Sequence, residues 1–199
     1  MNREKDSVRI ANKVSDVFNP YYASAPFFLV VALVATRSII RGLLYWLILA
    51  LFLSFLPMWD INRRIKRGMV ADAHISRRED RIKPFLFSLG AAVAGLIAAY
   101  AFGMPTLIKA VVWAVVLTGA GITIITRFWK VSLHAAGITP ITVVLLIMFG
   151  WYALPAILLV PLVYWARLVL KKHSLAQLIV GSLVSGGITV TVFRAFNLI

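Results

Sequence analysis

Most of this chain consists of apolar stretches long enough to cross a membrane, separated by short polar segments. The stretches lie at residues 21–36, 42–59, 84–102, 105–126, 136–151, 153–170 and 174–196. A helix of about 18–20 residues spans the hydrocarbon core of a bilayer, and only the first and fifth stretches are shorter. With 61% hydrophobic and 14% charged residues, the chain is too apolar for an ordinary soluble domain. We therefore expect an all-α, polytopic transmembrane helical bundle of six to seven spans.

Two regions are expected along the chain: an N-terminal segment at residues 1–20 and a single transmembrane domain at residues 21–199. In residues 5–18, apolar side chains recur at helical spacing: Val8, Ala11, Val14 or Ser15, and Phe18. This spacing predicts an amphipathic helix at the membrane interface, which would anchor the N-terminus on anionic lipid. Tight turns are expected at Gly103 with Pro105, Gly150 and Pro155, and kinks inside spans at Pro57, Pro140 and Pro161.

The basic residues indicate how the chain is oriented. Seven spans would place the N-terminus and the loops at residues 60–83, 127–135 and 167–173 on one side. All but four of the 21 Lys and Arg residues lie there, the exceptions being Arg37, Arg41, Lys109 and Arg194. By the positive-inside rule we expect a multi-pass protein of the cell membrane whose N-terminus and basic loops are cytoplasmic.

Composition also excludes several kinds of chemistry. The chain has no cysteine, which rules out disulfides and thiol nucleophiles. No carboxylate side chain follows Asp80, so a paired-carboxylate hydrolase or an acidic metal site would have to be built from the first 80 residues. We expect no metal and no cofactor. Membrane topology accounts for the net charge of +14, so we do not expect a nucleic-acid partner.

The three histidines fall in the three most basic stretches, and two of them have chemically suggestive neighbours. Gln177 follows His173 by one helical turn, so its amide could orient the imidazole and leave the other ring nitrogen free to attack phosphorus. His134 follows Lys130 and Ser132 and could serve as a general acid. Arginine and lysine around a phosphate would stabilise the transition state without a metal. His74 is interpreted as a solvated interfacial residue.

These residues resemble the motifs of the type 2 phosphatidic acid phosphatase family, membrane lipid phosphatases related to vanadium haloperoxidases. The family pattern Ser-Arg-x5-His-x3-Asp is similar to Ala166-Arg167-x5-His173-x3-Gln177, with alanine for serine and glutamine for aspartate. The pattern Pro-Ser-Gly-His is similar to Val131-Ser132-Leu133-His134. For Lys-x6-Arg-Pro, either Lys83-Pro84 stands for Arg-Pro, or Arg81 is the phosphate ligand supported by Arg77 or Arg78.

The resemblance covers about residues 72–177 and implies a metal-independent phosphatase with a phosphohistidine intermediate. The substrate would be a phospholipid or a polyprenyl (di)phosphate within the membrane lipids. His173 would be the nucleophile, His134 the general acid and Gln177 the residue that orients His173. The implied phosphate ligands are Arg167, Lys130, Ser132, Arg81, Arg78 and Lys83, drawn from the loops at 60–83, 127–135 and 167–177.

Two alternatives stay open at this stage. One is a catalytically lapsed relative that binds anionic lipid or a lipid diphosphate as a scaffold or carrier. The other is a small transporter, for which Lys109 and Arg194 near span ends are the candidate ionisable groups. The oligomeric state is not assigned.

Overall fold

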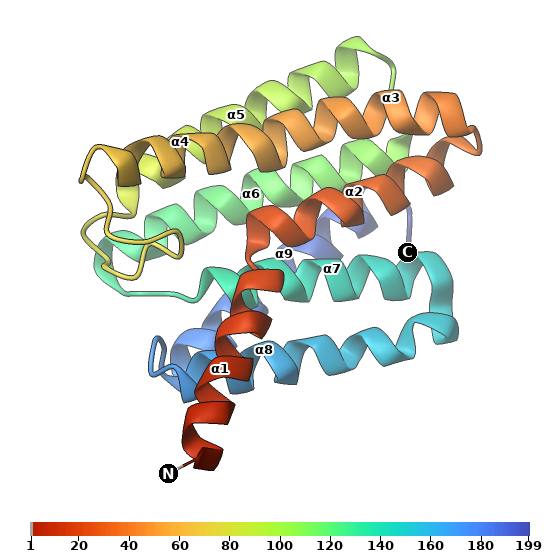
Figure 1. Cartoon of the computed structure of the whole chain (residues 1–199). Helices are drawn as coiled ribbons and strands as arrows, with labels where there is room; N and C mark the ends of the chain where they lie inside the picture. Colours follow the sequence, from red (N-terminus) through yellow and green to blue (C-terminus); the bar gives the residue numbers. More distant parts are fainter. Residues whose placement is uncertain (1) are drawn as a thin grey trace.

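The computed structural model describes residues 2–199, with side chains from residue 4 onward, and these residues form helices and connecting turns without any strand. Most of the helices from α1 to α9 follow one another through short turns, and a longer loop at 67–81 joins α4 to α5 (Figure 1). Their bounds are α1 Asn2–Val17, α2 Pro20–Thr36, α3 Ile39–Ala50, η1 Leu51–Phe55, α4 Leu56–Lys66, α5 Ile82–Ala101, α6 Thr106–Phe128, α7 Leu133–Phe149, η2 Gly150–Leu158, α8 Leu159–Val169 and α9 Leu175–Ala195. The all-α prediction is confirmed.

Among the described residues, five continuous helical segments are long and apolar enough to cross a membrane: Ile39–Lys66, Ile82–Ala101, Thr106–Phe128, Leu133–Val169 and Leu175–Ala195. A sixth becomes possible if α1 and α2, which are bent by 51° relative to each other, count as one broken span. The chain is therefore a multi-pass, helical membrane protein. The 42–59 stretch is part of one longer helical segment, α3–η1–α4, whose basic last turn continues past the apolar residues.

The predicted breakers lie where the helices turn or change pitch. Gly103 and Gly150 have positive φ angles of 59° and 58°, which glycine adopts without steric cost. Gly103 lies in the α5–α6 connection, and Gly150 starts the 3-10 turn η2, which contains Pro155. Pro57 is the second residue of α4, in the first turn after the π-helix η1, where the backbone accommodates the missing N–H of proline. At Gly150 the chain reverses, and α7 and α8 lie antiparallel (Figure 1).

Helix α1 packs against α8 (Figure 1), so it is part of the folded body. Its buried stripe consists of two small side chains one turn apart, Ala11 and Ser15, while Val8 is largely exposed. Small residues let two helices approach closely. Asn19 ends the break between α1 and α2, and its side chain caps α2 by accepting from the Tyr21 N–H at 3.1 Å. Of the residues whose spacing predicted α1, Ala11 and Ser15 are thus buried and Val8 is not.

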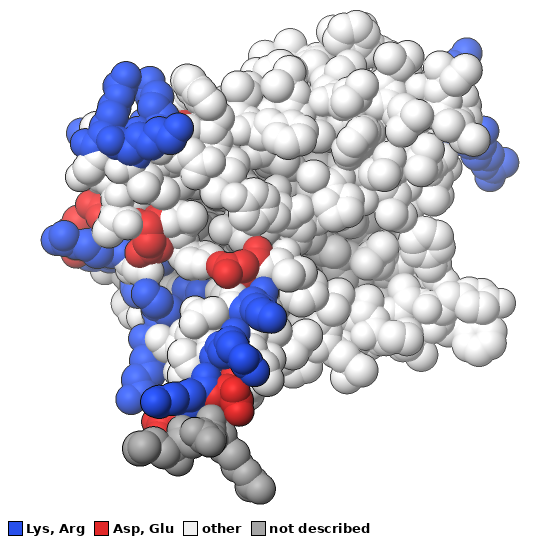
Figure 2. Space-filling model, in the orientation of Figure 1, with Lys and Arg blue, Asp and Glu red and all other residues white. Residues whose placement is uncertain are grey.

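One end of the bundle gathers most of the basic side chains. Figure 2 shows Lys and Arg concentrated at the end that carries α1 and the 67–81 loop, with a small group near the α2–α3 turn at the other end. Helices α7 and α9 pack closely at this end. A Cβ added to Gly181 would lie only 2.8 Å from the Ser132 carbonyl oxygen, which leaves no room for a side chain. The absence of a side chain at Gly181 of α9 therefore allows the start of α7 to approach closely.

Candidate active site

Three loops of the basic end are tied together by hydrogen bonds. The Ser132 N–H donates to the Gln177 carbonyl at 3.2 Å, which joins the start of α7 to α9. Lys130 Nζ donates to the Lys172 carbonyl at 2.9 Å, and Lys172 Nζ donates to Ser76 Oγ at 3.2 Å. These contacts link the loops at 67–81, 129–132 and 170–174. The structure thus brings together the three sequence regions that carry the predicted site residues.

His173 is held in one tautomer by Gln177. The side chain of His173 is buried, at 7% exposure, and its Nδ1 lies 3.0 Å from Gln177 Oε1. The same Oε1 accepts the Ser174 N–H at 3.3 Å, as part of a capping box at the start of α9. Since Oε1 can only accept, Nδ1 carries the proton and donates it. Nε2 is then the unprotonated nitrogen of the neutral ring, the state that a nucleophile requires.

Burial and surrounding positive charge keep His173 neutral. Burial, followed by the charges of Arg167 and Arg81, lowers the pKa of His173 to about 3. The hydrogen bond to Gln177 acts in the opposite direction but is outweighed. Protonation would place a third positive charge next to two arginines in a poorly solvated site. The Nε2 lone pair is therefore available throughout the physiological pH range.

Two arginines, Arg81 and Arg167, are almost completely buried, each at 1% exposure. Neither forms an ion pair with a carboxylate of the described residues, whereas Arg63 and Arg64 both pair with Asp60. A buried cation without a counter-ion is costly unless an anion binds beside it. Arg81 and Arg167 therefore mark a place where an anionic group would offset buried positive charge.

Arg81 also organises the loops around it. Its Nε donates to the Ile75 carbonyl at 2.9 Å, and a terminal nitrogen donates to the Val131 carbonyl at 2.7 Å. Burial lowers the pKa of Arg81 to about 10, so it stays charged at neutral pH. Two donor groups are used by backbone oxygens, and the remaining guanidinium N–H groups are available to an anion. Of the alternatives for the first motif, the structure favours Arg81, because Lys83 is exposed.

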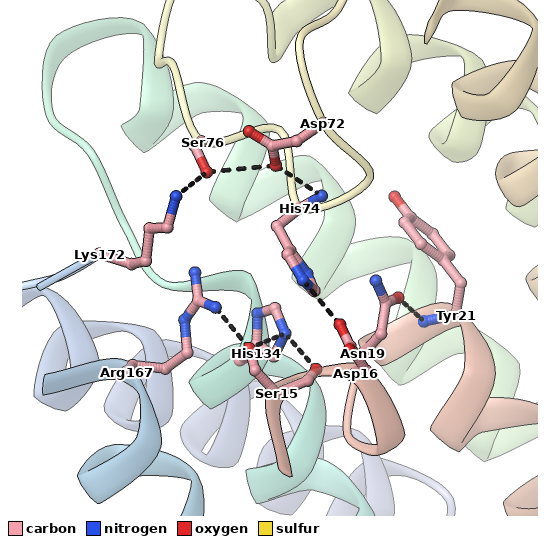
Figure 3. Close-up of polar contacts among 10 residues, drawn as sticks. All are labelled: Ser15, Asp16, Asn19, Tyr21, Asp72, His74, Ser76, His134, Arg167 and Lys172. Atoms are coloured by element: carbon pink, nitrogen blue, oxygen red, sulfur yellow. Dashed lines mark hydrogen bonds and ion pairs between the residues drawn. The ribbon is translucent and has the colours of Figure 1, made fainter. Parts of the chain in front are cut away.

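Arg167 has a polar atom left without a partner. Its Nε is buried and makes no hydrogen bond among the described residues. A terminal nitrogen donates to Ser15 Oγ of α1 at 2.5 Å (Figure 3). An unpaired buried N–H on a guanidinium is the feature expected of a site whose ligand is an oxyanion.

The other predicted phosphate ligands that the structure places near these loops, Ser132, Lys130 and Arg78, each form hydrogen bonds with the protein itself. Ser132 Oγ accepts the Ala135 N–H at 3.3 Å and so caps α7, which leaves its hydroxyl proton unused by that bond. Lys130 is half-buried, and burial together with the nearby charges of Arg81 and Arg167 lowers its pKa. Arg78 is exposed and donates to the carbonyls of Arg127 and Phe128, so it fastens the 67–81 loop to the end of α6.

Three residues that the sequence did not assign to the site lie in it: Ser15, Asp16 and His74 (Figure 3). His134 Nε2 lies 3.0 Å from the Ser15 carbonyl and 3.3 Å from Ser15 Oγ. His74 Nε2 lies 3.1 Å from Asp16 Oδ1, and the His74 and His134 rings are 5.2 Å apart between centroids. His74 is therefore a partner of α1 within the site and not a solvated interfacial residue. The signal available in the sequence was Ser15, which lies at the spacing of the apolar face of an otherwise charged helix.

An apolar cavity of about 180 Å³ extends from this end of the bundle into its core. Its lining includes Leu133 and Ala136, which lie on either side of His134 in the first turn of α7, and Pro20 and Tyr21 at the start of α2; it continues between α5, α6 and α7 to Val144. Almost the whole wall is apolar. The cavity therefore begins at the first turn of α7, where His134 lies, and is a space of the kind that holds a hydrocarbon chain.

Among the described residues, no group of three or more His, Asp or Glu side chains has an arrangement that could hold a metal ion. Comparison of the chain with protein-family models, with curated proteins and with solved structures found no match in any of the three. The site is thus defined by its own geometry: a neutral histidine and two buried arginines without a carboxylate partner among the described residues, with an apolar cavity that begins at the first turn of α7.

Proposed function

We propose that the protein is an integral membrane phosphatase that hydrolyses a lipid phosphate or a polyprenyl (di)phosphate through a phosphohistidine on His173. The observation that carries this proposal is the pair of buried arginines without a counter-ion, Arg81 and Arg167, around a histidine whose Nε2 is unprotonated. Guanidinium groups match the oxygens of a phosphate in geometry and charge. The same groups stabilise the charge of phosphoryl transfer without a metal.

In the first step, Nε2 of His173 attacks phosphorus and the bond to the leaving oxygen breaks. Gln177 holds Nδ1–H, so the phosphorylated ring stays oriented as it gains positive charge. In the second step, water attacks phosphorus, the P–N bond breaks, and inorganic phosphate leaves. A protonated imidazole beside the leaving oxygen completes the first step, and the site offers His134 and His74 for this role.

The apolar cavity supports a lipid as the substrate. Its near end lies at the first turn of α7, next to His134, and its far end lies deep in the bundle. A phosphate held by Arg81 and Arg167 would leave its hydrocarbon chain to enter this space. Burial of each CH2 group contributes about 0.8 kcal/mol, so the chain would supply much of the binding free energy.

The proposal includes the family that the sequence resembles, the type 2 phosphatidic acid phosphatases. Under it, His134, Arg167 and His173 occupy the corresponding motif positions. Lys130 and Ser132 complete the phosphate site, in which Arg78 and Lys83 have no direct part. Gln177 in place of the family aspartate favours a second candidate function, a lapsed relative that binds a lipid phosphate without turnover, because an amide stabilises an imidazolium less than a carboxylate does.

The topology belongs to the same proposal. Leu133–Val169 turns back on itself at Gly150 (Figure 1), so α7 and the η2–α8 segment would cross the membrane separately. Counted in this way, α2, α3–α4, α5, α6, α7, α8 and α9 give seven crossings, with the basic end cytoplasmic. The exposed Lys5, Arg9 and Lys13 of α1 would then lie at the level of anionic headgroups.

The direct test is release of inorganic phosphate by the purified protein from phosphatidic acid and from a polyprenyl diphosphate. We expect turnover by the wild type, none by His173→Ala, and wild-type turnover by the matched variant Lys109→Ala at the opposite end of the bundle. Binding of these lipids without phosphate release by the wild type would favour the lapsed relative. Equal turnover by wild type and His173→Ala would disprove the mechanism.

A further inference from the structure

A second histidine in the site is paired with a carboxylate from α1. His74 lies in the loop between α4 and α5, its backbone N–H donates to Asp72 Oδ1 at 2.9 Å, and its Nε2 donates to Asp16 Oδ1 at 3.1 Å. Asp72 also accepts from Ser76 Oγ at 3.2 Å, which fixes the loop (Figure 3). A carboxylate on one nitrogen of an imidazole fixes its tautomer and stabilises its protonated form.

The two neighbouring histidines both contact α1 through Nε2, but they differ in the partner that accepts this hydrogen bond. The Ser15 carbonyl can only accept, so the Nε2 proton of His134 is used by the α1 backbone at 3.0 Å. Nδ1 of His74 is buried and has no hydrogen-bond partner among the described residues. The His74 ring lies 5.2 Å from the His134 ring. Of the two, His74 is thus the imidazole with an unengaged buried nitrogen and a carboxylate behind it.

We propose that His74, oriented by Asp16 of α1, is the residue that transfers the proton to the leaving oxygen and later takes one from water. This inference rests on the proposed phosphatase function and deepens it, because it assigns the proton-transfer role to a residue outside the three sequence motifs. It also gives α1 a function: Asp16 is a positioning residue, and His134 holds the end of α1 through Ser15.

The proton balance is as follows. Protonated His74 gives its Nδ1 proton to the leaving oxygen as the P–O bond breaks and the His173 Nε2–P bond forms. The lipid leaves as an alcohol (or, from a diphosphate, as the monophosphate), and His74 is neutral. Water then attacks phosphorus, His74 Nδ1 accepts its proton, and the P–N bond breaks. Hydrogen phosphate leaves, His173 is again neutral, and His74 is again protonated.

Charged groups from several elements face His74. Burial and then the charge of Arg167 from α8 lower its pKa, while Asp16 from α1 and Asp72 from its own loop raise it. The neighbouring ring of His134 comes from α7. A phosphate bound at Arg167 adds negative charge, which favours the protonated ring. Substrate binding would therefore supply the acid in its protonated form.

The test compares two substrates in the full-length protein: phosphatidic acid, whose alkoxide must be protonated as it leaves, and p-nitrophenyl phosphate, whose phenolate needs no proton. His74→Asn retains a donor toward Asp16 but cannot exchange protons. We expect it to form phosphohistidine from phosphatidic acid about 10²- to 10⁴-fold more slowly than the wild type, while the rate with p-nitrophenyl phosphate changes little. Asp16→Asn, which retains the contact without the charge, should show the same substrate dependence more weakly.

The outcomes separate this inference from the function on which it rests. Phosphate release that persists in His173→Ala would overturn the phosphatase mechanism itself. If His173→Ala is inactive, an equal loss on both substrates in His74→Asn would show that His74 is only structural and would overturn this inference alone. Substrate-dependent loss in His134→Asn but not in His74→Asn would assign the general acid to His134 and would also overturn this inference alone.

Discussion

Replacing Gln177 by glutamate tests how His173 works as a nucleophile. Gln177 Oε1 accepts Nδ1–H of His173 at 3.0 Å and the Ser174 N–H at 3.3 Å. Glutamate is isosteric, so both hydrogen bonds are retained and the acceptor becomes charged. A neutral hydrogen bond contributes about 0.5–1.5 kcal/mol and one to a charged group about 1.5–3 kcal/mol. Since attack makes the ring positive, we expect a gain of about 1 kcal/mol in the transition state, or about fivefold in rate.

The assay is rapid-quench measurement of phosphohistidine formation at saturating phosphatidic acid. Gln177→Leu serves as the control, because it removes both hydrogen bonds at similar volume and should slow the step by at least tenfold. The carboxylate should also raise the pKa of His173 from about 3, which a shift in the acidic limb of the rate would report. If Gln177→Glu forms phosphohistidine no faster than wild type, the expected stabilisation of the positively charged ring is refuted; if Gln177→Leu is as fast as wild type, the orienting role of Gln177 is refuted.

Three further predictions follow from the packing, the topology and the charge of the site. Gly181→Ala places a Cβ 2.8 Å from the carbonyl oxygen of Ser132, the N-cap of α7, and should lower turnover at least tenfold. The control Gly187→Ala, whose Cβ would have nothing within 4 Å, should leave turnover unchanged, and equal turnover in both variants would contradict the close packing of α7 and α9. Cysteines introduced at Lys171 and Tyr152, in a chain without its own cysteine, should react with an impermeant maleimide from the cytoplasmic and the outer side respectively, and the reverse labelling would overturn the orientation. His173 has a pKa of about 3 in the folded state against 6.5 when exposed, so between these pH values the unfolded state binds a proton that the folded state does not. Proton binding to the unfolded state lowers the stability of the fold, so the melting temperature should fall as the pH drops below about 6.5. It should fall less in His173→Asn.

Much of the fold follows from the sequence because apolar length and breakers are local properties. The turns at Gly103 and Gly150 lie where the sequence predicts them. The pairing of His173 with Gln177 also follows from spacing alone, because residues four apart share a helix face. The continuity of the segment Ile39–Lys66 was less predictable, since the pattern of apolar residues does not show that α3, η1 and α4 form one helical segment.

The rest of the site depends on contacts between segments far apart in the chain. Asp16 and His74 are 58 positions apart, and Ser15 and Arg167 are 152 apart. The helical spacing allows Ser15 on the apolar face of α1, but it does not show which distant residues this face contacts. Arg81 and Lys83 likewise differ in burial, which the local sequence does not specify, and this difference is the reason to prefer Arg81 in the proposal.

The central claim is that His173 carries the phosphoryl group during turnover. The most direct measurement uses phosphatidic acid labelled with ³²P in the phosphate, followed by an alkaline quench that preserves phosphohistidine and mapping of the labelled peptide. The account predicts label on His173 in the wild type and none in His173→Ala. Release of phosphate by the wild type with no label on His173, or with label on another residue, would contradict it.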